Sequence, residues 1–199
     1  MRRSGDRWMR ARGLSLLLFA AGVAAAADPD WALEQLMREL AAVKESKAHF
    51  VERKYLKLLT APLQTEGQLL YRAPDRLEKY TLKPKAERMV VEAGRLTIEN
   101  IARGSKRVIA LSDNLALWGL VESIRATLKG DLPLLGIFYQ VKLSGERGKW
   151  RLKLIPRELK MQAAVEWIQI DGRDQRIESI EVLETKGDRS VMSIHEDAQ

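Results

Sequence analysis

Residues 67–94, GQLLYRAPDRLEKYTLKPKAERMVVEAG, predict three short strands joined by turns. In the first strand, Leu69 and Tyr71 share one face by the two-residue repeat of β-structure. Pro74 and the Lys83-Pro84 pair interrupt the pattern, because proline cannot donate a ladder hydrogen bond and favours turns. A third segment with the same alternation follows. The whole pattern predicts a curved antiparallel sheet rather than a catalytic site.

The first 27 residues have the organisation of a secretory signal peptide. Five arginines accompany an apolar run at residues 14–25 (LSLLLFAAGVAA), and Ala25, Ala26 and Ala27 suit a cleavage site. The apolar run is short for a membrane span, although an uncleaved anchor or a buried N-terminal helix would also fit it. We therefore expect a cleavable signal peptide at 1–27, one mature domain at 28–199 and a bacterial periplasmic location.

Charge and cysteine content narrow the class of protein further. The whole chain has a net charge of +7, but five arginines and one aspartate lie in the signal segment, so the mature domain carries about +3. This small excess argues against a nucleic-acid partner. No cysteine is present, which leaves neither disulfides nor a lipid-modified N-terminal cysteine. Many carboxylates alternate with basic residues, as in Glu52-Arg53 and Glu78-Lys79, which is typical of solvated strand faces.

Hydrophobic periodicity predicts two amphipathic helices among many strands. One helix precedes residue 47, with an apolar stripe of Leu33, Leu36, Met37 and Leu40. The second runs from the helix-start residues 112–114 to Gly130, with the stripe Leu117, Leu120, Val121, Ile124 and Leu128. Residues 131–133 are expected to end it, and 136–144 to form a strand. With nine or ten strands, the predicted fold class is α+β, a large antiparallel sheet with helices on one face.

The sequence offers little support for catalysis. His49 and His195 are far apart, and no metal-ligand spacing, Gly-x-Ser-x-Gly motif or glycine-rich phosphate loop occurs. Lys79, Tyr80 and Glu87 are the nearest candidates for the polar groups that an enzyme would need. We expect a protein without catalytic residues, metal or cofactor. An apolar sheet face under a helix fits either an ordinary core or a ligand cavity, and the sequence leaves both open.

Several short motifs follow one another in the order found in a family of periplasmic proteins. Residues 47–52 (KAHFVE) resemble that family's Phe-x-Ala-x-Phe-x-Gln signature, and residues 67–74 (GQLLYRAP) resemble its Gly-x-Leu-x-x-x-Arg-Pro segment. Residues 90–95 (VVEAGR) look like its Val-x-Asp-Gly-Lys hairpin, and residues 150–156 and 171–172 follow in the same order. By these motifs the mature chain resembles the LolA-type outer-membrane lipoprotein carriers.

The resemblance implies an incomplete, open antiparallel β-barrel, with an N-terminal helix and an inserted lid helix over an apolar cavity. Such a monomer would take the acyl chains of a lipoprotein or related envelope lipid from an inner-membrane donor complex to an outer-membrane acceptor. The cavity would be lined by Leu69, Tyr71, Leu77, Met89, Val91, Leu96, Ile98, Trp150 and Leu152. The lid would carry Leu117, Leu120, Val121, Ile124 and Leu128.

One position departs from the family's pattern. The family has an inward arginine that latches the lid directly before the proline, whereas this chain has Ala73 there and Arg72 one residue earlier. A one-residue offset directs a side chain to the opposite face of a strand. The replacement favours a divergent member with a different cargo or release mechanism. The alternative is a periplasmic interaction or sensor domain of the same fold, with a filled core and no cargo.

Overall fold

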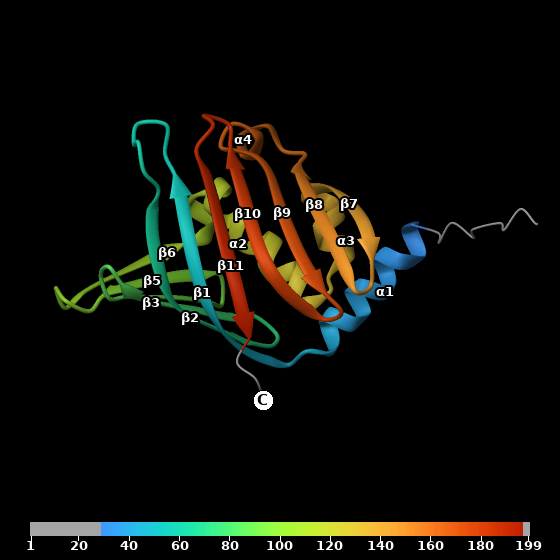
Figure 1. Cartoon of the computed structure of the whole chain (residues 1–199), viewed down its shortest axis with the longest axis horizontal. Coiled ribbons are helices and arrows are strands. Elements are labelled where there is room, and N and C mark those ends of the chain that lie inside the picture. Colours follow the sequence, from blue (N-terminus) through green and yellow to red (C-terminus); the bar gives the residue numbers. More distant parts are fainter. Residues whose placement is uncertain (1–28, 197–199) are drawn as a thin grey trace, which may run out of the picture.

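The computed structural model of the protein describes residues 29–196, and the predicted signal peptide lies outside this range. Within it, the chain forms one antiparallel sheet of eleven strands with helices against it (Figure 1). The strand order is β6-β5-β4-β3-β2-β1-β11-β10-β9-β8-β7. Sequence neighbours therefore pair throughout, apart from the contact between β1 and β11, which joins the two halves of the sheet.

The strands are β1 (Glu45–Tyr55), β2 (Leu63–Arg72), β3 (Arg76–Lys83), β4 (Glu87–Glu92), β5 (Arg95–Asn100), β6 (Ser105–Ala110), β7 (Tyr139–Glu146), β8 (Lys149–Pro156), β9 (Val165–Arg173), β10 (Arg176–Glu184) and β11 (Arg189–Glu196). The helices are α1 (Pro29–Ala42), α2 (Leu115–Lys129), α3 (Leu132–Phe138) and α4 (Leu159–Gln162), and a 3-10 turn, η1 (Leu111–Asp113), precedes α2. The predicted sheet with helices on one face is confirmed, with more strands than expected.

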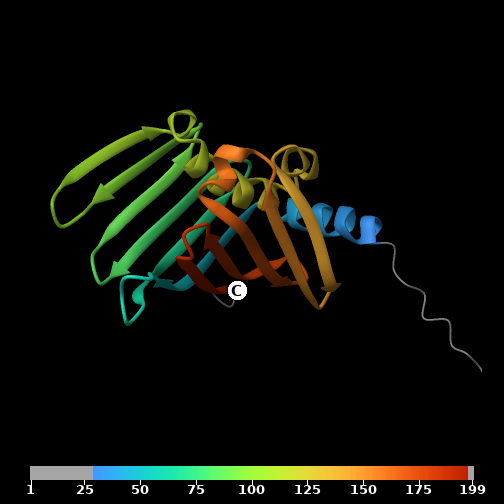
Figure 2. The same cartoon turned by 90° about the horizontal axis from the view of Figure 1, so that it is seen from above.

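The sheet is strongly bent. Figure 2 shows β2–β6 and β7–β10 as two walls that meet near β1 and β11, with α2, α3 and α4 on the inner side of the bend. We call the side of the sheet that α2 covers the inner face and the opposite side the outer face. By register, Phe50, Tyr71 and Val91 lie on the inner face, whereas Glu78 and Tyr80 lie on the outer face.

The inserted helix α2 begins and ends where its sequence predicts. The Asn114 side chain accepts a hydrogen bond from the Leu117 amide (3.0 Å), which caps the first turn. Gly130 ends the helix with φ +68°, a left-handed conformation that favours glycine. The close approach of α1 adds a second reason, because a Cβ at Gly130 would lie 2.1 Å from the Met37 carbonyl oxygen.

The prediction for the residues after Gly130 was wrong. Asp131 does not end the helical region but caps α3, its side chain accepting from the Leu134 amide at 3.1 Å. Pro133 lies in the first turn of α3, where its missing N–H has no helical partner to lose. The strand expected at 136–144 therefore begins only at Tyr139, because the preceding apolar residues form this short helix.

The main core lies between the β7–β10 wall and the helices. It consists of Leu36, Met37, Leu40, Ala126, Leu135, Tyr139, Trp150, Leu152, Leu154, Met161, Ile168 and Ile170. The predicted apolar stripe of α1 supplies three of these residues, which explains why that helix is amphipathic. Among the described residues, no helix combines the length and the apolar character needed to cross a membrane.

Candidate lipid-binding groove

The inner face of the β2–β6 wall carries an apolar strip that the strand register aligns. Each residue of one row faces the next across neighbouring strands, in the order Tyr71, Leu77, Val91, Leu96 and Ile109. The next row, two residues further along each strand, is Leu69, Lys79, Met89, Ile98 and Arg107. The row next to α2 thus has no charged residue, whereas the following row includes Lys79 and Arg107.

The first half of α2 covers this strip. Leu117, Trp118 and Val121 pack against β3, β4 and β5, and we call the resulting set the groove cluster: Leu77, Met89, Val91, Leu96, Ile98, Leu111, Leu117, Trp118 and Val121. Five of the predicted cavity residues and two of the predicted lid residues therefore meet. Trp118 also packs edge-on against Phe138 of α3, with ring centroids 4.5 Å apart.

The remaining predicted site residues lie elsewhere. Trp150 and Leu152 are 3% and 0% exposed within the main core, and Leu120 of α2 packs against that same core. Tyr71 is buried and Leu69 half-buried in the rows described above. Ile124 and Leu128 are half-buried on α2. The predicted cavity set is thus divided between two apolar clusters, with α2 contributing to both, and its contact with lipid stays a prediction.

A small pocket opens at the edge of the groove cluster. Its volume is about 290 Å³, and it is lined by Asp75, Val91, Ala93, Gly94, Leu111, Trp118, Glu122, Arg125 and Leu134. This is at the lower end of the range for small-molecule pockets. A long acyl chain needs more room, so binding one would require the side chains of the groove cluster to separate.

Two charged residues of α2 that the apolar pattern did not single out lie at this pocket. The Arg125 guanidinium donates to the Glu122 carboxylate from Nε, at 3.0 Å to each oxygen, and from Nη2, at 2.6 Å. The bond to Glu122 raises the pKa of Arg125, although partial burial acts against it. Residues three positions apart lie on the same side of a helix, so the spacing of Glu122 and Arg125 was a feature of the sequence from which the pair could have been predicted.

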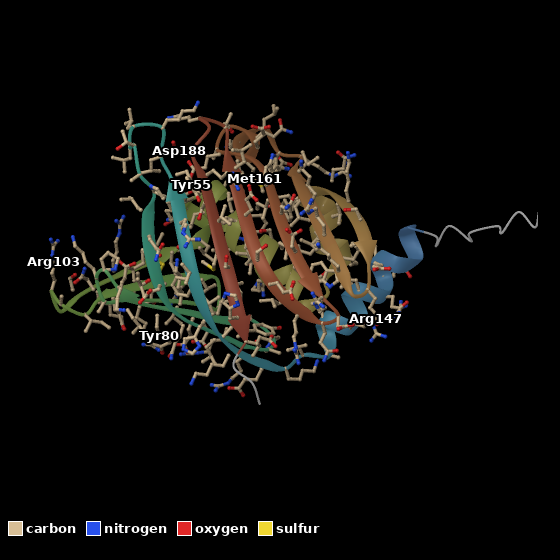
Figure 3. The ribbon with its side chains drawn as sticks, in the orientation of Figure 1. Tyr55, Tyr80, Arg103, Arg147, Met161 and Asp188 are labelled. Atoms are coloured by element: carbon tan, nitrogen blue, oxygen red, sulfur yellow. The ribbon has the colours of Figure 1, made fainter. Side chains whose placement is uncertain are left out.

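The middle of α2 is fastened to the rest of the protein. The buried Tyr139 hydroxyl donates to the Gly119 carbonyl at 2.7 Å, and its burial raises the pKa of Tyr139. A Cβ at Gly119 would lie 2.3 Å from the Met161 methyl group, so glycine allows α2 to approach α4 closely (Met161 is labelled in Figure 3). Ser123 and Thr127 are fully buried. The groove-facing side chains lie on the first two turns, close to this attachment.

The residues next to Pro74 lie as their sequence offset predicts. Ala73 is half-buried, and Arg72 lies on the outer face, where its guanidinium pairs with Glu45 at 3.1 Å. Both charged side chains of that pair are more than half exposed, so the pair adds little to stability. Arg72 therefore does not take the place of an inward arginine.

The three candidate catalytic residues do not converge. Lys79 and Glu87 lie in adjacent rows of the inner face, whereas the Tyr80 hydroxyl is on the outer face and donates to the Glu78 carboxylate. Two carboxylates expected to be solvated are in fact buried: Glu52 on the inner face and Glu78 on the outer face. Their ion pairs with lysine or arginine explain why burial is tolerated.

Comparison with known proteins places the chain in a family. Residues 21–197 match the family described as outer membrane lipoprotein carrier protein LolA-like. None of the curated proteins matches the chain. The solved structures similar to it include a LolA superfamily protein from Nitrosomonas europaea, with 9% identity, 85% of this chain and 92% of that chain covered, and a TM-score of 0.47.

Two further solved structures are similar at the same level. A DUF1329 family protein from Desulfovibrio piger has 14% identity, 86% and 94% coverage of this and that chain, and a TM-score of 0.48. The MucA/MucB complex of Pseudomonas aeruginosa contains a chain with 17% identity, 81% and 55% coverage, and a TM-score of 0.47. The match over residues 21–197 carries the assignment: this chain belongs to the LolA-like family of outer membrane lipoprotein carrier proteins.

Proposed function

We propose that the protein binds acyl chains of a lipoprotein or related envelope lipid in the groove between α2 and β3–β5, and carries them through the periplasm towards the outer membrane. The observation that carries the proposal is the separation of the groove cluster from the main core. Because α1, α3, α4 and the β7–β10 wall keep their own core, the groove can open without dissolving it. The family assignment supports the same function.

The energetics of acyl chains make such a carrier necessary. Leaving one chain of about sixteen carbons in water costs on the order of 12 kcal/mol, at ~0.8 kcal/mol per methylene. A bound chain would replace the contacts that Leu117, Trp118 and Val121 make with the sheet. The apolar surface uncovered when the groove opens would therefore be covered again by the lipid, which keeps the net cost of opening small.

The attachment of α2 at Gly119 bears on how the groove would open. Tyr139 and Met161 hold the middle of the helix against the core, so we propose that α2 does not swing away as a whole. Instead, the β3–β6 part of the sheet would move away from Leu117, Trp118 and Val121 of α2. This differs from a hinged lid that carries Leu120 with it, because Leu120 faces the main core.

We propose further that the protein acts without catalysis, with an inner-membrane donor complex and an outer-membrane acceptor as partners. These assignments follow from the resemblance of the sequence motifs to the LolA-type carriers. A second candidate function is a periplasmic interaction domain with no cargo. The filling of the groove cluster by side chains, which leaves a pocket of only about 290 Å³, favours that alternative.

Isolation of the protein with its native lipids separates the two. The full chain would be expressed in a Gram-negative host, purified from the periplasm without detergent, and analysed by native mass spectrometry and lipid extraction. A carrier is expected to retain a bound acyl lipid in a fixed ratio and to bind a fluorescent acyl probe competitively. Protein that carries no lipid and does not bind the probe would favour the interaction domain.

A further inference from the structure

We propose that the polar end of the groove, formed by Lys54, Lys79 and Glu52, binds the acidic head of the lipid, a carboxylate or phosphate carried on an acyl chain. This inference rests on the proposed lipid-binding function. It assigns the cargo a chemical class, an anionic amphiphile, which neither the family nor the apolar groove specifies.

Lys79 lies on the inner face directly beside the apolar strip. It faces Leu69 of β2 on one side and Met89 of β4 on the other. Its neighbour Leu77, two residues away on the same face, belongs to the groove cluster. Two residues of a strand span about 7 Å, so a head held at Lys79 would place its acyl chain over Met89 and Leu77 and then under α2.

The path of the Lys79 side chain depends on Gly67. Gly67 lies opposite Phe50 on β1 and opposite Thr81 on β3, and it puts no side chain on the inner face between them. The Lys79 ammonium therefore reaches across β2, where it lies 4.7 Å from the centroid of the Phe50 ring and pairs with Glu52 of β1.

Glu52 links Lys79 and Lys54, and these two lysines offset its negative charge, so it does not exclude an anionic ligand. It is 6% exposed, and its oxygens accept hydrogen bonds from Lys79, from the Ser190 hydroxyl at 2.7 Å and from the Thr65 hydroxyl at 3.4 Å. Lys54 Nζ lies 3.6 Å away. Burial acts to raise the pKa of Glu52, but the charges of Lys79 and Lys54 outweigh it and lower the pKa, so the carboxylate is ionised.

Lys79 keeps hydrogen-bonding capacity for a ligand. An ammonium group has three donors, and Glu52 is its one hydrogen-bond acceptor among residues 29–196. The Lys79 side chain is 22% exposed and that of Lys54 is 52% exposed, so both are accessible to solvent and to a ligand on the inner face. A carboxylate or phosphate could accept from both lysines while Glu52 remains paired.

The charges of this face favour an anion. Lys83 at the end of β3 is already paired with Glu66 at 2.6 Å. On the inner face of β1–β6, the register places three other cations and two carboxylates: Lys54, Lys79, Arg107, Glu52 and Glu87. The net excess of one positive charge, beside the apolar rows, is complementary to an amphiphile with a single acidic head.

The test compares two lipids that differ in the head alone. Binding of palmitate and of uncharged monopalmitoylglycerol would be measured at pH 8 for the wild type, for Lys79→Met and for the matched control Lys83→Met. The wild type is expected to bind palmitate about tenfold more tightly than the uncharged lipid, as a charge-assisted hydrogen bond allows. Lys79→Met should remove this difference without weakening the uncharged lipid, and Lys83→Met should change neither affinity.

Lys79→Met leaves the buried Glu52 carboxylate with one cation fewer, which could itself disturb folding. A second variant therefore controls for this effect. The double variant Lys79→Met/Glu52→Gln removes both charges and should show the same loss of head-group preference. Equal wild-type affinity for both lipids, equal loss of both in Lys79→Met, or butyrate binding as tightly as palmitate would overturn the inference and leave the carrier function standing. Failure to bind either lipid would overturn the carrier function itself.

Discussion

Leu117→Asp tests whether the groove cluster is the lipid site. Leu117 lies on the first turn of α2, is half-buried, and packs against the apolar strip of β3–β5. Its amide is already bonded to the Asn114 side chain, a backbone contact that the substitution leaves in place. The change therefore puts a carboxylate on the groove surface while keeping the helix cap.

The expected loss of stability is small. Full burial of a leucine side chain is worth about 1.5–3 kcal/mol, so a half-buried one contributes about 1 kcal/mol. An aspartate in the first turn of a helix gains about 0.3–1 kcal/mol from the helix dipole. The net loss should be less than about 1 kcal/mol, which corresponds to a fall in Tm of no more than about 2–4 °C.

The expected loss of lipid affinity is much larger. A bound acyl chain would lie against the new carboxylate and remove water from it, at a cost of about 2 kcal/mol or more. This lowers affinity by about thirtyfold or more. Binding would be measured by titration with a fluorescent acyl probe, and folding by thermal melts followed by circular dichroism.

The matched control is Ile137→Asp, which puts the same charge on α3 at a residue that is 62% exposed. It should change neither affinity nor Tm. If Leu117→Asp stays folded and binds the probe as tightly as the wild type and the control do, the groove cluster is not the binding site.

Three further predictions concern the framework of the site. Burial acts to raise the pKa of Glu78, but hydrogen bonds from Tyr80 and two arginines lower it to about 2. Wild-type stability should therefore fall by up to about 3 kcal/mol between pH 5 and pH 2 as this carboxylate is protonated, and urea melts of Glu78→Gln should show a smaller fall over that window. Tyr139→Phe leaves the Gly119 carbonyl without its buried donor, so it should lower the free energy of unfolding by about 1–3 kcal/mol and speed amide hydrogen exchange in the middle of α2. Unchanged exchange would mean that this bond does not anchor the helix. Gly67→Ala places a Cβ 1.8 Å from the Tyr80 carbonyl oxygen, so β2 and β3 must shift apart. Chemical denaturation should show a loss of about 1–3 kcal/mol in the free energy of unfolding. A variant as stable as the wild type would show that the two strands separate there without strain.

The two-residue alternation in the sequence predicted which residues of β3–β5 line the groove, but it did not predict which other inward-facing residues lie outside the groove. Leu77, Met89, Val91, Leu96 and Ile98 share the inner face because the two-residue repeat is unambiguous in short strands joined by tight turns. The same rule could not separate them from Trp150 and Leu152, which also face inwards. Which strands α2 crosses decides that division, and this depends on tertiary packing.

Two other features could not be predicted from the sequence pattern, for physical reasons. The segment LPLLGIF forms α3 rather than the start of a strand, because a short apolar run fits either structure and the cap at Asp131 selects the helix. The pair of Lys79 with Glu52 joins strands that are not sequence neighbours. It depends on the missing side chain at Gly67, which becomes visible only when β1, β2 and β3 are aligned.

Photocrosslinking with a diazirine-labelled fatty acid would locate the bound lipid in the native protein. After irradiation and digestion, mass spectrometry is expected to find the label on peptides that contain Leu77, Met89, Ile98 or Leu117, with unlabelled lipid competing it away. Labelling confined to other surfaces of residues 29–196, or labelling that competitor lipid does not reduce, would contradict acyl-chain binding between α2 and β3–β5.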